Sequence, residues 1–572
     1  MRSLAALLLV ILGGGVYAQT PSDDIPPSTI RVATRMVVID VIATDKNGGL
    51  VTGLKPNDFS VIENGKPQEI AGFRFEAGRE AGSRLLPPLP QYVYTNRIDY
   101  GVPAGPLTVV LLDGLNTPAR DQLYARQQLL KYLKTQLQPN QHIAVFALTS
   151  RLRVLQDFTS DPELLRSAIE AFAAQDSRQL LMEQEGGRPA PSDLRANQAY
   201  QAAAGALRAM LLERASIAYG ERVADTLAGF RAIGRALAGY PGRKNLVWIS
   251  AGFPMIFTAE SSIPSGGDAQ RIFVDRSFQQ ETRETARQLA EARVSVYPVD
   301  ARGLVGASTM DASSDLKNEQ GQVYLGQDLA RAISQSDSSL LASQSTMEQI
   351  AADTGGIAYM NQNEIDHAVA LSVSDGTSYY SMAYYPTDKN WDGKFRDVRL
   401  RVDRPDVHLR YRRGYYAVDS LKTMLQRTNS ADSDLISVLQ GEFLPATMIT
   451  FDVRVVPPAP SASVSVPVEF LVNLNTLSFE SADHGKRRYV ADFHLAAFAT
   501  DGKLTAHVDK RLEAAPTKEE YEQLRQRGLP FQTSVDLPPG CYHLRLVVRD
   551  SRTGSMGSLE IPLTIEKARR ED

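Results

Sequence analysis

The chain has 572 residues, too many for one hydrophobic core, and its length predicts several domains. Hydrophobic residues make up 43% and charged residues 22% of the chain, with a formal net charge of −4, so no basic face is large enough to predict nucleic-acid binding. Cys541 is the only cysteine, which excludes an internal disulfide.

The N-terminus has the pattern of a secretory signal peptide. Arg2 precedes an apolar run over residues 4–12, and small residues follow up to Val16-Tyr17-Ala18. This pattern predicts cleavage after Ala18 and export, to the periplasm or out of the cell. The run is shorter than the roughly 20 residues that span a bilayer, and no later stretch is long enough, so no transmembrane segment is expected.

A β-rich segment is expected next, over residues 31–76, after a polar, proline-rich leader at 19–30. Asn64-Gly65 separates two alternating runs, and both residues tolerate the positive φ of a type I′ turn, which predicts a β-hairpin. Residues 77–104 are rich in glycine and proline and are interpreted as a linker.

Strands and helices alternate over residues 105–372. The stretch "LTVVLLDGLNTP" at 107–118 is an apolar strand that ends on Asp113 and opens into a polar turn. Further strands are predicted at 142–150, 151–158, 245–253, 294–300 and 357–361, and helices at 119–136, from Asp161-Pro162, up to Ala238, at 274–292 and up to Gly355-Gly356. Mostly apolar strands alternating with helices predict a doubly wound α/β domain with a mainly parallel sheet.

Other parts of the chain are predicted from composition and alternation. The polar stretches 178–196 and 303–336 are expected to be surface insertions. Strands over 378–417 are expected to complete a β-sandwich with residues 31–76, beside the α/β domain. Residues 418–447 are interpreted as a linker or helical segment, and residues 448–567 as a C-terminal β domain.

The carboxyl ends of the predicted parallel strands are the expected functional edge of the sheet. Asp113, Ser250 and Asp300 all lie at such ends, and open α/β sheets hold their ligands there. Asp300 and Arg302 are expected to form an ion pair.

Several stretches resemble the von Willebrand factor A (VWA) family, and most closely its secreted relatives in Acidobacteria. The resemblance covers roughly residues 31–417, and its stretches include "VVLLDGLNT", "DTLAGFRAIGRALAGYPGRKNLVWISAGFP", "VSVYPVDARGL", "IAADTGGIAY" and "KPNDFSVIENGKPQEIAGF". It implies a VWA-like, Rossmann-like fold and a metal-ion-dependent adhesion site for Mg²⁺ or Mn²⁺.

The family's metal site is only partly matched. Its pattern is Asp-x-Ser-x-Ser, then a threonine from a later loop, then an aspartate. Asp113, Thr117 and Thr226 match, whereas Leu115 and Ala251 stand where the middle serine and the later aspartate belong. A hard cation needs oxygen ligands, so the resemblance implies an incomplete site.

Two readings of this site stay open. In one, Asn116 substitutes through its amide oxygen, so that a weak metal site contains Asp113, Asn116, Thr117 and Thr226. In the other, Asp113 caps the following helix and the turn is structural.

A second candidate cation site lies at 388–393. Asp388, Asn390, Asp392 and Gly393 match the first half of an EF-hand loop. Arg399 occupies the twelfth position, where calcium needs a glutamate, so a hairpin turn is favoured.

No enzyme motif stands out in the sequence. We therefore predict an exported, non-enzymatic protein-binding, adhesion or scaffold protein whose partner is a protein ligand or envelope component. Partner recognition is expected near Ser250 and Asp300. The alternatives are an exported hydrolase or carbohydrate-active protein, with Asp483, His484 and Asp492 as candidates, and a purely structural envelope component.

Overall fold

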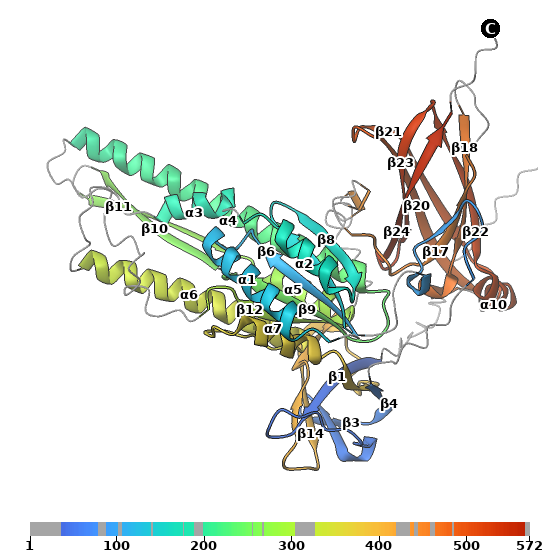
Figure 1. Ribbon diagram of the computed structural model, residues 1–572, viewed down its shortest axis with the longest axis horizontal. Coiled ribbons are helices and arrows are strands. Elements are labelled where there is room, and N and C mark those ends of the chain that lie inside the picture. The colour runs from blue at the N-terminus through green and yellow to red at the C-terminus, as the bar shows by residue number, and fades with distance from the viewer. Residues whose placement is uncertain are drawn as a thin grey trace, which may run out of the picture. The chain divides into compact units, whose positions relative to one another are not determined.

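The computed structural model shows three folded parts: a small β-sandwich, an α/β domain and a C-terminal β-sandwich (Figure 1). The predicted signal peptide and leader lie outside the described residues. Those residues are 36–77, 87–100, 106–138, 141–174, 177–187, 198–253, 256–265, 268–303, 327–418, 435–436, 438–439, 444–457, 464–482 and 486–566.

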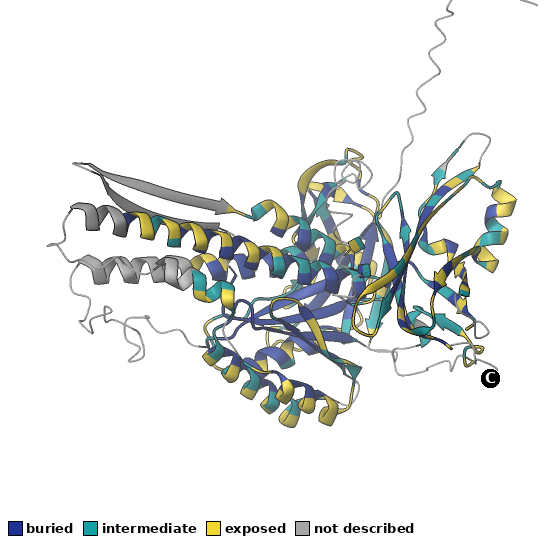
Figure 2. Cartoon of the chain, turned by 90° about the horizontal axis from the view of Figure 1, so that it is seen from above, coloured by how far each residue is buried: buried dark blue, intermediate teal, exposed yellow. Residues whose placement is uncertain are grey.

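The α/β domain is built on a five-stranded mixed sheet with the strand order β12-β9-β6-β7-β8. Four strands are parallel, and β8 runs antiparallel to β7 at one edge. Every residue of β6, β9 and β12 is buried, as expected for strands covered on both faces (Figure 2). The strands are β6 (Leu107–Asp113), β7 (His142–Leu148), β8 (Leu152–Thr159), β9 (Lys244–Ser250) and β12 (Val294–Asp300).

Helices pack on both faces of this sheet. Along β6, Val109 and Leu111 belong to one apolar cluster and Val110 and Leu112 to the other, which follows the two-residue period of a strand. The first cluster contains residues of α4 (Gln198–Leu237), α5 (Gln279–Glu291) and α6 (Gln327–Thr354), and the second contains residues of α1 (Ala119–Thr135), α2 (Pro162–Ala171) and α7 (Ile365–Ser374).

Several segments of the α/β domain differ from the sequence-based expectation. Helix α3 (Arg178–Gly187) occupies most of the first predicted insertion, and α6 begins within the second. The helix predicted over 274–292 begins only at Gln279, because β10 (Ile256–Ser265) and β11 (Asp268–Ser277) form a hairpin before it. Tyr359 makes an isolated bridge to Val299 in place of a full strand.

The small β-sandwich joins segments from distant parts of the chain. Its sheets have the orders β15-β1-β13-β4 and β16-β14-β2-β3, and their facing side chains, such as Val41, Phe59 and Tyr380, share one core. Asn64 and Gly65 both have positive φ, as the predicted turn requires. The strands are β1 (Val37–Thr44), β2 (Phe59–Glu63), β3 (Lys66–Gln68), β4 (Ile70–Ala77), β13 (Ser378–Tyr384), β14 (Asp392–Val402), β15 (His408–Arg410) and β16 (Gly414–Val418).

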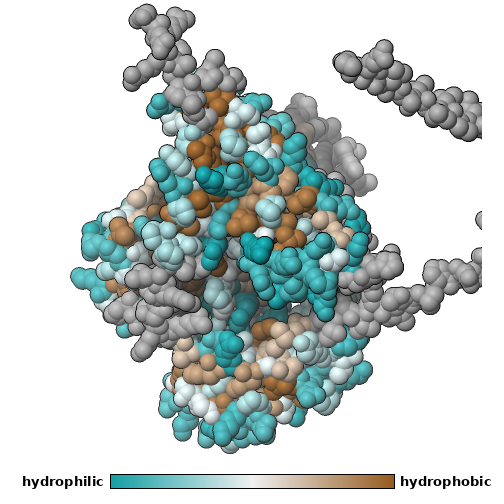
Figure 3. All heavy atoms as spheres, turned by 90° about the vertical axis from the view of Figure 1, so that its right-hand side faces the viewer, coloured by the Kyte–Doolittle hydropathy of each residue, from teal (hydrophilic) through white to brown (hydrophobic). Residues whose placement is uncertain are grey.

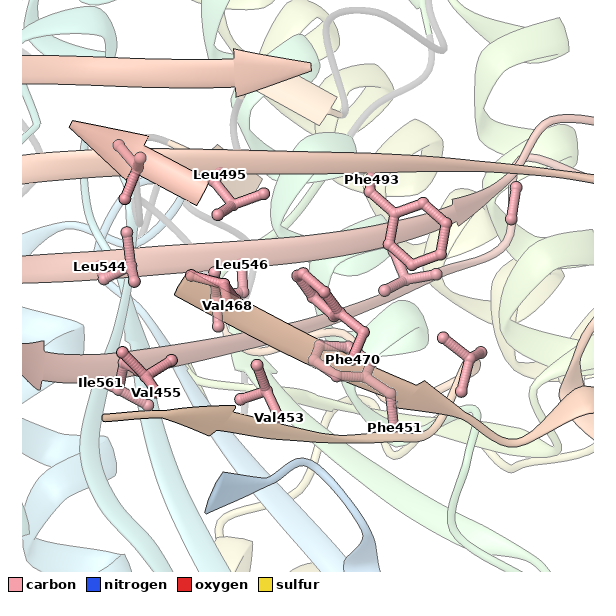
Figure 4. Packing of buried hydrophobic residues seen from close by; sticks show 14 of the residues in the cluster. Phe451, Val453, Val455, Val468, Phe470, Phe493, Leu495, Leu544, Leu546 and Ile561 are labelled. Atoms are coloured by element: carbon pink, nitrogen blue, oxygen red, sulfur yellow. The ribbon is translucent and has the colours of Figure 1, made fainter. Parts of the chain in front are cut away.

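The C-terminal sandwich packs the sheet β22-β18-β17-β5 against the sheet β19-β20-β23-β24, with β21 also paired to β20. Figure 4 shows Phe451 and Phe470 of one sheet and Phe493 of the other within its core. The elements are β17 (Phe451–Val455), β18 (Val464–Val472), β19 (Glu480–Ser481), β20 (Arg487–Ala499), β21 (Leu504–Ala514), α10 (Lys518–Arg527), β22 (Leu529–Leu537), β23 (Gly540–Asp550) and β24 (Met556–Ile565).

Strand β5 (Val93–Thr95) belongs to this C-terminal sandwich, although it lies in the segment 77–104 interpreted as a linker. It pairs with β17, and the adjacent Asn96 fixes it there. The Asn96 side chain donates to the Ile449 carbonyl (2.8 Å) and accepts from the Phe451 N–H (2.8 Å). The segment is therefore partly structural.

Candidate functional site

Asp113 ends β6 and lies at the centre of a buried hydrogen-bond network. Its side chain is buried, and Oδ1 accepts from the backbone N–H groups of Leu115 (3.1 Å) and Asn116 (2.9 Å). The carboxylate thereby holds the polar turn that follows the strand. Asp113 does not cap helix α1, contrary to one of the two predicted roles. The N-cap residue of α1 is Pro118, and no side chain caps this helix.

The second oxygen of Asp113 receives two side-chain donors. Oδ2 accepts from Asn116 Nδ2 (2.7 Å) and from Trp248 Nε1 (2.8 Å) on β9. The indole ring of Trp248 packs edge-on against Phe230 of α4, with ring centroids 4.9 Å apart. Four N–H groups thus point at a carboxylate that offers about four acceptor positions.

Helix α4 joins the network through Arg222 and Thr226, which lie one helical turn apart. Asn116 Nδ2 donates to Thr226 Oγ1 (2.9 Å), and the Thr226 hydroxyl donates to the Arg222 carbonyl (2.8 Å). The Arg222 guanidinium donates to Asn116 Oδ1. All three side chains are buried, so the Asn116 amide bridges the β6 turn and α4 inside the protein.

Thr117 connects the same turn to the end of β9, where Ser250 forms a local hydrogen bond. Thr117 Oγ1 accepts from the Ala251 N–H (3.0 Å), and Ser250 Oγ accepts from the Gly252 N–H (3.3 Å). Both hydroxyl-bearing side chains are buried.

Asp300 and Arg302 form the expected ion pair at the end of β12. Arg302 Nε and one terminal nitrogen donate to the two carboxylate oxygens at 2.9 and 2.8 Å. Ser250 and Asp300 were expected to contact a partner, but the side chains of both are buried. Neither side chain is available for direct contact in this structure.

Burial raises the pKa of Asp113, because water no longer solvates its charge. Hydrogen bonds from Asn116, Trp248 and Ser250 act in the opposite direction and favour the carboxylate. N–H donors at all its acceptor positions suit the ionised form.

The predicted metal ligands Asp113, Asn116, Thr117 and Thr226 do lie together, but as arranged they do not fit Mg²⁺ or Mn²⁺. A hard cation needs free oxygen lone pairs in near-octahedral order, and these oxygens accept N–H groups. Elsewhere in the described ranges, no group of three or more His, Cys, Asp or Glu side chains could hold a metal ion.

The EF-hand-like segment has a different arrangement. Asp388 Oδ1 accepts from the Asn390 N–H (2.9 Å), and the Arg396 guanidinium binds the carbonyl groups of Asp388 (2.8 Å) and Asn390. The permanently charged Arg396 side chain therefore already binds these two loop carbonyl groups. The segment links β13 to β14, which lie in different sheets, so the predicted hairpin turn is a crossover between sheets.

In the C-terminal sandwich, Asp492 is held as a structural carboxylate. It accepts from Arg511 Nε (2.6 Å) and from the Ser551 hydroxyl (2.7 Å). Burial opposes its charge, but these hydrogen bonds leave its pKa below the ordinary value. Asp483 and His484 lie outside the described residues.

Two members of the Asp113 network, Arg222 and Trp248, were not predicted from the sequence. The spacing of Arg222 and Thr226, four residues apart in a helix, was a usable signal, because such residues share a face. Nothing in the strand pattern indicated that the Trp248 N–H would meet Asp113.

No family model and no curated protein match the chain. Solved structures that match include an aerotolerance-related membrane protein from Bacteroides fragilis, at 12% identity over 47% of this chain and 99% of that chain, with a TM-score of 0.23. The vWF domain of the type V pili tip protein Mfa5 from Porphyromonas gingivalis matches at 10% identity over 48% and 96%, with a TM-score of 0.25. The pilus adhesin SpaC from Lactobacillus rhamnosus GG matches at 7% identity over 91% and 59%, with a TM-score of 0.21. These values are too low to assign a family or a function to this chain.

Proposed function

We propose that the protein is an exported, non-enzymatic protein-binding, adhesion or scaffold protein of the cell envelope, built on a VWA-like domain. The proposal rests on the buried Asp113 network at the carboxyl end of the α/β sheet. Sheets of this kind usually hold ligands at this edge. Here the polar groups of the Asp113 network form hydrogen bonds with one another and are buried. The sheet then acts as a rigid framework, and recognition takes place on the outer surface.

The helix α4 offers a surface for a protein partner. Leu207, Met210 and Ile217 are 56%, 55% and 44% exposed, and their spacing places them on one face of the helix. We name these three residues the α4 stripe. Exposed charges of both signs, at Glu213 and Arg214, lie beside it and suit a polar rim around an apolar contact.

The surface of the protein otherwise mixes polar and apolar residues. Figure 3 shows hydrophilic residues over most of one face, with hydrophobic residues in separate patches. Among the described residues, no helix is both long and apolar enough to cross a membrane. A water-facing protein that docks through a local apolar stripe fits these observations.

Photo-crosslinking in intact cells that produce the protein tests the proposal. A photoreactive amino acid is placed at Leu207 and, as a matched control, at Leu164 of α2, which is 48% exposed. We expect a discrete protein adduct from Leu207 that is absent from Leu164. Met210→Glu should abolish this adduct, because a charge in the contact disfavours burial.

The same labelling pattern at Leu164 and Leu207, or no adduct at Leu207, would contradict a partner surface on α4. Fractionation of the same cells locates the protein. Recovery in the cytoplasm alone would contradict the export that the N-terminal pattern supports.

A further inference from the structure

Arg222 brings a permanent positive charge into the network around Asp113. The residue is buried, and its guanidinium donates to Asn116 Oδ1. The amide nitrogen of the same side chain donates to Asp113 Oδ2 at 2.7 Å. Cation and carboxylate are therefore linked through a single side chain, and the cation stays charged at every physiological pH.

A buried carboxylate needs groups that compensate its negative charge. Removing a charge from water costs several kcal/mol unless other charges or hydrogen bonds compensate it. The four N–H groups on Asp113 favour its ionised form, and Arg222 adds an opposite charge on the other side of the Asn116 amide.

This arrangement leaves no free oxygen ligands for a divalent cation. It would need the oxygens of Asn116, Thr117 and Thr226, which accept from Arg222, the Ala251 N–H and Asn116 respectively. It would also lie next to a guanidinium of the same charge sign, which is unfavourable at low dielectric.

We propose that Arg222 is an internal substitute for a divalent metal. Its charge holds the β6 turn against α4, so the carboxyl end of the sheet stays ordered without any metal ion. Arg222 is thus a positioning residue, and this role does not depend on whether the α4 stripe binds a partner.

Thermal unfolding of the full mature protein tests this proposal, with EDTA, Mg²⁺ or Mn²⁺ added in turn. The wild-type Tm should be the same in all three. Arg222→Gln keeps a hydrogen-bond donor but removes the charge, and we expect its Tm to fall by roughly 6–15 °C, because the buried network loses the positive charge that balances its carboxylate. Arg222→Lys keeps the charge and should lose less than half as much.

Arg214→Gln, on the exposed face of the same helix, is the matched control and should change the Tm by no more than about 2 °C. A saturable rise of the wild-type Tm with Mg²⁺ or Mn²⁺ would overturn the proposal. So would an Arg222→Lys loss equal to or above that of Arg222→Gln, because charge would then not be what matters. These readouts involve no partner, so they fail or succeed independently of the crosslinking experiment.

Discussion

Asp113 illustrates how the role of a residue depends on the donors that surround it. Its place at a strand end is one that metal-binding aspartates also occupy. In this fold the carboxylate accepts backbone N–H groups from its own turn and the indole N–H of Trp248. Because these donors use its acceptor positions, the carboxylate acts as a structural acceptor.

Trp248→Phe should destabilise the protein by about 1.5–3 kcal/mol. The substitution keeps an aromatic ring beside Phe230 and Phe253 but removes the donor to the Asp113 carboxylate, and hydrogen bonds to charged groups are in this range. Urea denaturation followed by circular dichroism measures the change. Trp391→Phe, at the other tryptophan, is the control, and an equal loss in the two variants would argue against the Asp113 bond.

Lys244 should make stability depend on pH. The side chain is buried at the start of β9 and donates to the Tyr240 carbonyl (2.8 Å). Burial, with a smaller contribution from the charge of Arg293, lowers its pKa from the ordinary 10.5 to about 7, while Asp40 opposes the shift. Between these two pH values the unfolded chain binds a proton that the folded protein does not. The free energy of unfolding therefore rises with pH through that window.

Lys244→Met removes this penalty. We expect the variant to be more stable than the wild type at pH 6–7, by an amount of order a few kcal/mol, and the advantage to shrink towards pH 10. Denaturant titrations at four pH values measure it. A stability difference that stays constant from pH 6 to pH 10 would show that Lys244 does not titrate as described.

At the scale of elements, Glu63 ties the two sheets of the small sandwich together. This carboxylate on β2 accepts from Tyr384 on β13 (2.7 Å), Tyr415 on β16 (2.9 Å) and Arg396 on β14 (3.2 Å). Glu63 and Arg396 are both buried. Four strands thus meet at one polar cluster inside an otherwise apolar core.

Glu63→Ala should cost about 3–5 kcal/mol, because it leaves the Arg396 charge buried without its carboxylate partner. Equilibrium unfolding gives the total loss, and hydrogen exchange should show it first in β2 and β14 of one sheet and in β13 of the other. Glu76→Ala removes a carboxylate from an exposed pair with Arg74 and should have little effect. Unchanged exchange in β13 after Glu63→Ala would contradict the tie between sheets.

Element boundaries were predicted well where local signals are strong. Asn64-Gly65 and Gly355 have the positive φ that their positions in a turn and at a helix end require. The β10–β11 hairpin was missed although "SGGD" at 265–268 is a usual turn composition. The polar residues of the segment also concealed α3, which packs against α4.

At the scale of the whole molecule, β5 makes the C-terminal sandwich depend on a segment far away in sequence. Thr95, Tyr94 and Val93 pair with residues 452–454 of β17. Without β5, the edge of β17 would present unpaired backbone groups to water or to other chains.

We therefore expect a fragment of residues 444–572 to be less stable and more prone to aggregate than the same fragment joined to residues 87–100 by a flexible linker. Size-exclusion chromatography and thermal unfolding compare the two. Asn96→Ala in the joined fragment should remove much of the gain, because the side chain bonds both Ile449 and Phe451. Equal stability with and without residues 87–100 would show that β5 is dispensable.

Features that depend on neighbouring residues could be predicted from the sequence. Apolar runs such as Val109–Leu112 predicted buried strands, and alternation with helices predicted an α/β domain with helices on both faces. The hydrogen-bond partners of Asp113, by contrast, depend on tertiary packing. Its partners Asn116 and Trp248, and Arg222 behind Asn116, come from three parts of the chain, and Trp248 lies 135 positions away. Sequence patterns report which groups are present, but whether an oxygen faces an N–H or a metal depends on how distant elements pack.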